Sequence, residues 1–69
     1  MSREEIDILY NCKNIADNFT DRLKLNFYDS REKINQRKMY IISHLKRTAI
    51  RFPVIEKELN EIVSKLTVL

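Results

Sequence analysis

A regular repeat of apolar residues over the second half of the chain constrains its fold more than any other feature. From Ile34 to Leu69 the repeat advances in alternating steps of four and three, and the phase does not slip. A spacing that averages 3.5 residues keeps one line of an α-helix facing a neighbouring helix. We call this line the second seam, and its eleven positions are Ile34, Lys38, Ile41, Leu45, Thr48, Phe52, Ile55, Leu59, Ile62, Leu66 and Leu69.

A shorter repeat, the first seam, lies near the start of the chain. Ser2 and Glu5 have the form of a capping box, which predicts the beginning of a helix. This helix is expected over about residues 3–26. Its apolar positions are Leu9, Cys12, Ala16, Phe19 and Leu23, with Ile8 and Ile15 widening the line on one side.

The two seams are out of phase, so the register breaks between Lys24 and Glu32. Either a helix reversal or a stutter within one long helix accounts for such a break. Asn26 is a suitable C-terminal cap, and Asp29 with Glu32 repeats the capping-box form, so we favour the reversal. A second helix is then expected over about residues 30–69.

Pro53 lies inside this second predicted helix. Proline removes a backbone hydrogen bond and clashes with the preceding turn, at a cost of about 3 kcal/mol. The phase nevertheless runs unbroken from Phe52 to Ile55. We therefore predict that the helix is kinked or interrupted near Pro53. It is either one kinked helix or two helices that meet almost end to end, with Pro53 in the first turn of the second.

The chain has 69 residues, which we assign to a single domain, 1–69, whose core supplies only about 3–5 kcal/mol. It contains no glycine and one cysteine, Cys12, so tight β-turns and disulfides are not expected. We predict an all-α, coiled-coil-like fold, either a helical hairpin or kinked long helices. Because two helices of this length leave apolar surface uncovered, further copies or helical partner proteins are expected to complete the bundle.

This argument makes the seams the predicted partner-binding surface. The function expected first is that of a non-enzymatic structural or adaptor subunit of a multiprotein complex. The predicted partner-binding residues are Ile41, Leu45, Phe52, Ile55, Leu59, Ile62 and Leu66 of the second seam, and Leu9, Ile15, Phe19 and Leu23 of the first.

Charge suggests an alternative function. Residues 1–30 carry a net charge of −2, residues 31–51 carry +6 and residues 52–69 carry −1, which sum to the overall +3. The basic segment predicts a small DNA- or RNA-binding regulator. Its possible nucleic-acid-binding residues are Arg31, Lys33, Arg37, Lys46, Arg47 and Arg51. Because Lys38 falls on the second seam, these cations are not expected to form one continuous line.

An acidic first helix packed on a basic second helix is also expected to gain modest Coulombic complementarity.

No group of residues predicts catalysis. His44 has no acidic residue within four positions, and Cys12 lies at a packing position of the first seam. We therefore predict no catalytic residue, no cofactor and no metal site.

The chain begins without the pattern of a signal peptide, and its longest apolar run, 39–42, is too short to span a membrane. An intracellular protein, cytoplasmic or nuclear, is expected.

Overall fold

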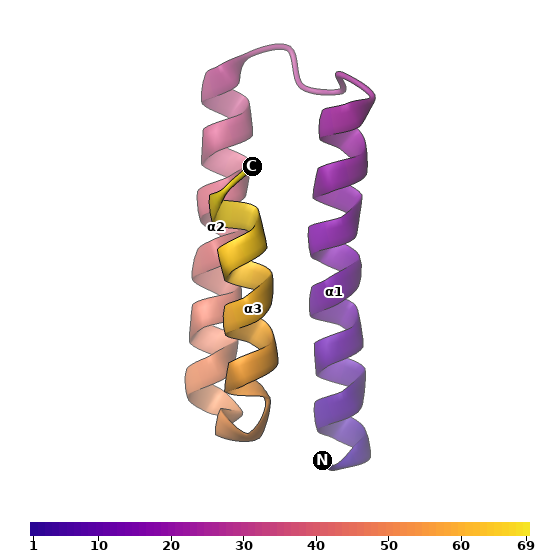
Figure 1. Cartoon of the computed structure of the whole chain (residues 1–69), viewed down its shortest axis with the longest axis vertical. Helices are drawn as coiled ribbons and strands as arrows, with labels where there is room; N and C mark the ends of the chain where they lie inside the picture. The colour runs from indigo at the N-terminus through magenta and orange to yellow at the C-terminus, as the bar shows by residue number, and fades with distance from the viewer.

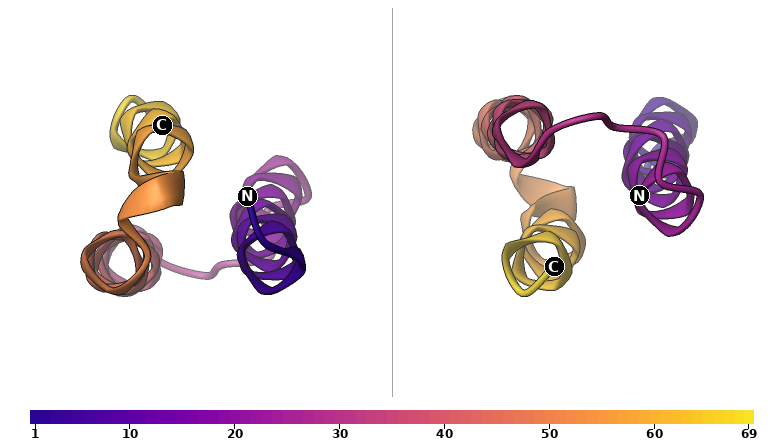
Figure 2. Two further views of the ribbon diagram at one scale, coloured as in Figure 1. Left: turned by 90° about the horizontal axis from the view of Figure 1, so that it is seen from below. Right: turned by 90° about the horizontal axis from the view of Figure 1, so that it is seen from above.

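A computed structural model describes residues 1–69 as a bundle of three α-helices without strands. The helices run up, down and up, side by side (Figure 1), and form a triangle when viewed from either end (Figure 2). The molecule measures 39 × 17 × 15 Å. Its elements are α1 (Arg3–Lys24), α2 (Arg31–Arg51), a short 3₁₀ helix η1 (Pro53–Ile55) and α3 (Glu56–Thr67). The all-α prediction is confirmed.

The predicted capping box begins α1. The Ser2 amide donates a hydrogen bond to Glu5 Oε1 at 2.8 Å, and the Glu5 amide donates to Ser2 Oγ at 3.2 Å. The bond from the Ser2 amide holds the pKa of the Glu5 carboxyl below its ordinary value, and the Ser2 side chain adds to this effect. The first turn of α1 is therefore stabilised by hydrogen bonds between residues three positions apart.

Residues 25–30 reverse the chain, so the predicted turn is confirmed and the stutter is excluded. Asn26 adopts a positive φ of 54°, the left-handed conformation that ends many helices. The Phe27 amide donates to the Arg22 carbonyl at 3.0 Å, which satisfies one of the last carbonyls of α1. Leu25 is the C-cap, and Asn26 follows it in the position that glycine often occupies, because asparagine tolerates the left-handed conformation better than most residues do.

The predicted cap of the second helix was placed one residue too early. Ser30 is the N-cap, and its hydroxyl accepts a hydrogen bond from the Lys33 amide at 3.2 Å. Asp29 instead forms an ion pair with the Lys33 side chain at 3.0 Å. This is the only ion pair in the structure, so the expected complementarity of the first two helices produces no ion pair between them.

The end-to-end arrangement predicted around Pro53 is wrong, because the chain reverses there and α3 packs back along α2. Phe52 is extended, with φ −130° and ψ 75°, as expected for a residue that precedes proline. Pro53 then begins the 3₁₀ turn, where its missing amide is tolerated. The apolar phase continues through the reversal because Phe52 and Ile55 face the same core from the two sides of the turn.

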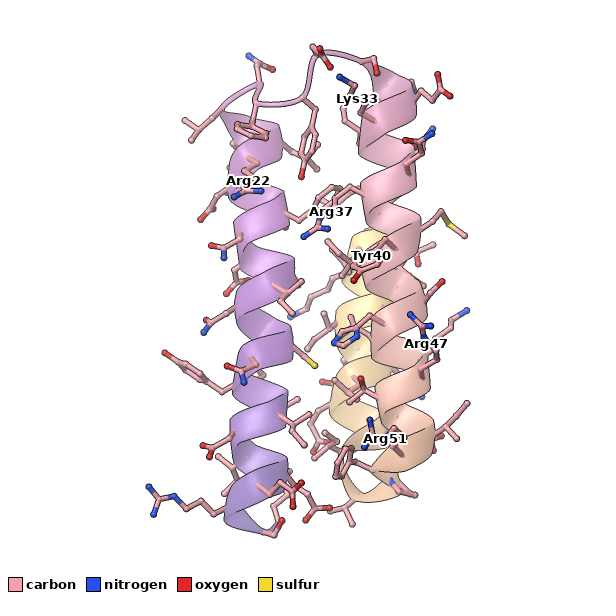
Figure 3. All side chains as sticks on the ribbon, turned by 180° about the vertical axis from the view of Figure 1, so that it is seen from behind. Arg22, Lys33, Arg37, Tyr40, Arg47 and Arg51 are labelled. Carbon is pink, nitrogen blue, oxygen red and sulfur yellow. The ribbon has the colours of Figure 1, made fainter.

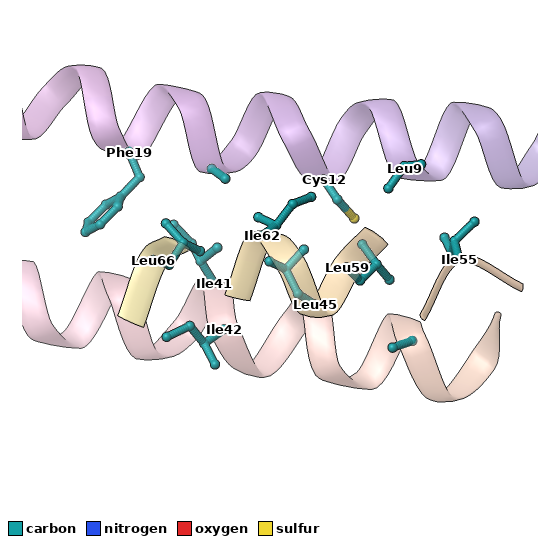
Figure 4. Close-up of a cluster of buried hydrophobic side chains, with 12 residues drawn as sticks. Leu9, Cys12, Phe19, Ile41, Ile42, Leu45, Ile55, Leu59, Ile62 and Leu66 are labelled. Carbon is teal, nitrogen blue, oxygen red and sulfur yellow. The ribbon is translucent and has the colours of Figure 1, made fainter. Parts of the chain in front are cut away.

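The core lies between the three helices and contains no polar side chain (Figure 4). Its twelve buried residues are Leu9, Cys12, Ala16, Phe19, Ile41, Ile42, Leu45, Ala49, Ile55, Leu59, Ile62 and Leu66. Of the eleven predicted partner-binding residues, eight belong to this core, whereas Ile15, Leu23 and Phe52 are partly buried against it. The premise that the chain cannot cover its own seams is therefore wrong. The reversal at Pro53 divides the second seam between α2 and α3. These two parts pack against each other and against the first seam on α1.

None of the helices has the length and apolar character needed to cross a bilayer.

Candidate functional site

A line of long polar side chains runs along α2. Its members Arg37, His44 and Arg51 line cavities shared with α1, whereas Tyr40 and Arg47 line a shallow hollow formed by α2 alone. We call this line the basic stripe; its members are Lys33, Arg37, Tyr40, His44, Arg47 and Arg51. The steps of four, three, four, three and four keep all six within a sector of about 80° over a length of about 27 Å. Figure 3 shows the labelled members on this one face. All are exposed except His44, which is partly buried.

The cations of residues 31–51 do not all lie on one line, as the position of Lys38 predicts. Lys33, Arg37, Arg47 and Arg51 share the stripe, whereas Arg31 and Lys46 lie outside it by helical phase. These six were the predicted nucleic-acid-binding residues.

Arg22 of α1 joins the stripe across the space between the helices. It lines a small cavity of about 90 Å³ together with Arg37 and Tyr28. Tyr28 lies in the connection between the helices and packs its ring on Phe19, with ring centroids 5.7 Å apart. Arg22 is not among the predicted site residues because it belongs to a segment of net negative charge. No local signal indicates that it faces α2.

A cleft of about 300 Å³ lies between α1 and α2 along the lower half of the stripe. Its lining combines apolar, amide and basic side chains with a single carboxylate, and consists of Glu4, Ile8, Asn11, Cys12, Ile15, His44, Thr48, Arg51 and Phe52. On the wall formed by α1, Asn11 and Asn18 line the two cavities, and Glu4 is the only acidic residue that lines either. The face between α1 and α2 is therefore predominantly positive.

Three arginines of this face contact aromatic rings. The Cζ atom of Arg22 lies 4.9 Å from the centroid of Phe27, and that of Arg37 lies 5.2 Å from Tyr40. At the lower end, Arg51 lies 5.6 Å from Phe52. Such contacts orient a guanidinium group without neutralising its charge.

The arginines of the face have no carboxylate within ion-pairing distance. The single ion pair of the structure joins Lys33 to Asp29, and it leaves Arg22, Arg37, Arg47 and Arg51 without acidic partners. Three guanidinium groups on α2 and one on α1, none of them in an ion pair, produce a positive potential that attracts anions.

The cleft also contains the two residues with nucleophilic or general-base chemistry. Cys12 is only 2 % exposed, and burial raises the pKa of its thiol, so the thiol stays protonated near neutral pH. A protonated, buried cysteine acts as a packing group, the role that its spacing predicts. His44 lines the same cleft and is partly buried. The structure brings no group of three or more His, Cys, Asp or Glu side chains together as metal ligands.

The candidate site is therefore the basic stripe with Arg22 and the facing wall of α1. Its distinguishing properties are charge, exposed aromatic rings and an elongated shape. No known protein family, curated protein or solved structure gives a significant match to this chain.

Proposed function

We propose that this chain is a non-enzymatic binding protein whose basic stripe binds the phosphate backbone of nucleic acid. The observation that carries the proposal is the row of cations along the stripe, of which only Lys33 has an acidic partner. Arginine dominates the row, and its planar guanidinium donates paired hydrogen bonds to phosphate oxygens. Phosphate contacts supply most of the affinity of non-specific nucleic-acid binding.

Charge reversal tests this proposal. Arg37→Glu combined with Arg51→Glu inverts the charge at two places on the stripe. The matched control, Lys57→Glu with Lys65→Glu, makes the same change in net charge at exposed positions of α3. Binding of a fluorescein-labelled oligonucleotide, measured by anisotropy, is expected to be lost in the stripe variant and to be weakened only slightly in the control. Equal losses in both variants contradict a specific role for the stripe.

Assembly with helical proteins is the second candidate function, and the cleft between α1 and α2 favours it. The partly buried Ile8 and Ile15 line this cleft, where a fourth helix would cover them. In this case the surface that contacts a second copy or an acidic partner is the cleft, and not the seams, which are buried within the chain.

Sedimentation equilibrium at micromolar concentrations tests self-assembly through the cleft. If copies assemble there, the wild-type mass is a multiple of 8.3 kDa, and Ile15→Glu returns it to that of the single chain. The exposed substitution Asn14→Glu is the control and leaves the assembly intact. A wild-type mass of 8.3 kDa across the concentration range excludes self-assembly.

A further inference from the structure

We infer that the nucleic acid bound by this face is single-stranded, and that its bases stack on the exposed ring of Tyr40. This inference rests on the proposed function and deepens it by naming the class of nucleic acid. Three features of the face carry it: the exposed aromatic rings beside arginines, the acidic outer side of α1, and the single line along which the cations lie.

The aromatic rings are placed where unpaired bases can reach them. Tyr40 is 59 % exposed in the middle of the stripe, and Arg37 contacts its ring. Phe27, 63 % exposed, lies with Arg22 at the end of the bundle that holds the connection 25–30. Paired bases of a duplex are already stacked on one another, whereas the bases of a single strand are free to stack on protein rings. An aromatic ring beside an arginine can therefore bind one nucleotide, with the base stacked on the ring and the phosphate near the guanidinium group.

The charges of α1 oppose the docking of a duplex. The major groove of B-DNA is about 12 Å wide, and packed helices lie about 8–10 Å apart. If α2 entered the groove, α1 would lie over one of the flanking phosphate backbones. By helical phase, the side of α1 turned away from the core carries Asp7, Asp21 and Arg3, all exposed, and its net charge of −1 would weakly repel those phosphates.

A single strand avoids this repulsion because it needs only the line of the stripe. Lys33 and Arg37 are one helical turn apart, as are Arg47 and Arg51, so each pair places two cations about 6 Å apart along the axis. Tyr40 lies between the two pairs. The facing wall of α1 adds the side-chain amides of Asn11 and Asn18 near this line. Its only acidic side chain is Glu4, at the lower end.

The test compares a fluorescein-labelled oligothymidine of about 12 nucleotides with a duplex of the same length, by anisotropy in the same buffer. The single strand is expected to bind about tenfold more tightly than the duplex. Equal binding, or tighter binding of the duplex, overturns the inference but leaves the proposed function in place. Failure to bind either probe overturns both.

Two tyrosines provide a matched pair of variants that isolates stacking from charge. Tyr40→Ala is expected to weaken binding of the oligothymidine about tenfold, and Tyr40→Phe to retain it. Tyr10, 64 % exposed on α1, is the control, and Tyr10→Ala is expected to bind like the wild type. Circular dichroism verifies that each variant is folded. Equal effects of the two alanine variants overturn the stacking role.

Competition with polyglutamate distinguishes nucleic acid from an acidic protein ligand. The peptide is expected to displace the oligothymidine only weakly, because it offers charge without bases. If polyglutamate of equal charge competes as well as unlabelled oligothymidine does, the face recognises negative charge alone, and the inference is overturned.

Discussion

Leu59 has no solvent-exposed surface and lies in the core on the inner side of α3 (Figure 4). From the sequence, Leu59 is predicted to be a partner-binding residue at the middle of the second seam. In the structure its contacts come from the same chain. This residue therefore stabilises the fold of the single chain, and substitutions here report on folding before they report on any ligand.

Leu59→Ala is expected to lower the free energy of unfolding by about 2–5 kcal/mol, because it removes buried methyl groups and leaves a cavity. The exposed control Leu25→Ala, at a residue that is 79 % exposed, is expected to change it by less than about 0.5 kcal/mol. Urea unfolding followed by circular dichroism measures both. Similar small effects at the two positions would show that Leu59 is not in the core of the monomer.

Two surface carboxylates, Glu5 and Asp29, make the free energy of unfolding depend on pH in the acidic range. Hydrogen bonds from Ser2 lower the pKa of Glu5, and a hydrogen bond and ion pair with Lys33 lower that of Asp29. The unfolded chain then binds protons at a higher pH than the folded chain does. The stabilisation is therefore complete above the ordinary carboxyl pKa and is lost as the pH falls through the lowered values.

We expect the double variant Glu5→Gln with Asp29→Asn to lose less stability than the wild type as the pH falls below about 4.5. Glutamine retains the shape of the capping side chain, so the change removes the titration and not the cap. Thermal unfolding at a series of pH values measures the difference. Parallel curves for the two proteins contradict this assignment.

At the scale of elements, local sequence signals account for most of the observed structure. The Ser2–Glu5 box, the cap at Asn26 and the phase break between the seams are local features, so the two boundaries they set were predictable. The reversal at Pro53 was not, because three residues of 3₁₀ helix return the chain to the core without disturbing the apolar phase. Periodicity records which residues face the core, but it does not record the direction in which the helix runs.

The elements also differ in how firmly they are held. The hairpin formed by α2 and α3 is packed extensively, whereas α1 contacts each of the other helices less. We therefore expect backbone amides of α1 to exchange with deuterium faster than those at the centres of α2 and α3. Exchange followed by NMR measures this order. Identical protection of all three helices would mean that the bundle opens only as one unit.

At the scale of the whole molecule, charge is distributed unevenly. Residues 31–51 hold a net charge of +6, and the rest of the chain holds −3. The positive segment was evident in the sequence. Its organisation into one face was not, because Arg22 reaches that face from an acidic helix, and only the tertiary arrangement shows which side of α2 lies next to α1.

Salt dependence measures how many cations of this face contact phosphates. With five cations, Lys33, Arg37, Arg47, Arg51 and Arg22, the logarithm of the affinity for a single strand is expected to fall with the logarithm of salt concentration with a slope of up to about −3.5. Arg37→Gln is expected to reduce the magnitude of the slope by about 0.7. Lys57→Gln on α3 is expected to leave it unchanged. A slope near zero contradicts binding through phosphate contacts.

An NMR titration of the ¹⁵N-labelled protein with oligothymidine tests most directly the proposal that the face between α1 and α2 is the functional surface. The largest changes in amide chemical shift are expected at Arg22 and along the basic stripe from Lys33 to Arg51. The amides of α3, Glu56–Thr67, are expected to stay near their free positions. Changes concentrated on α3, or the absence of any change at saturating oligonucleotide, would contradict the claim.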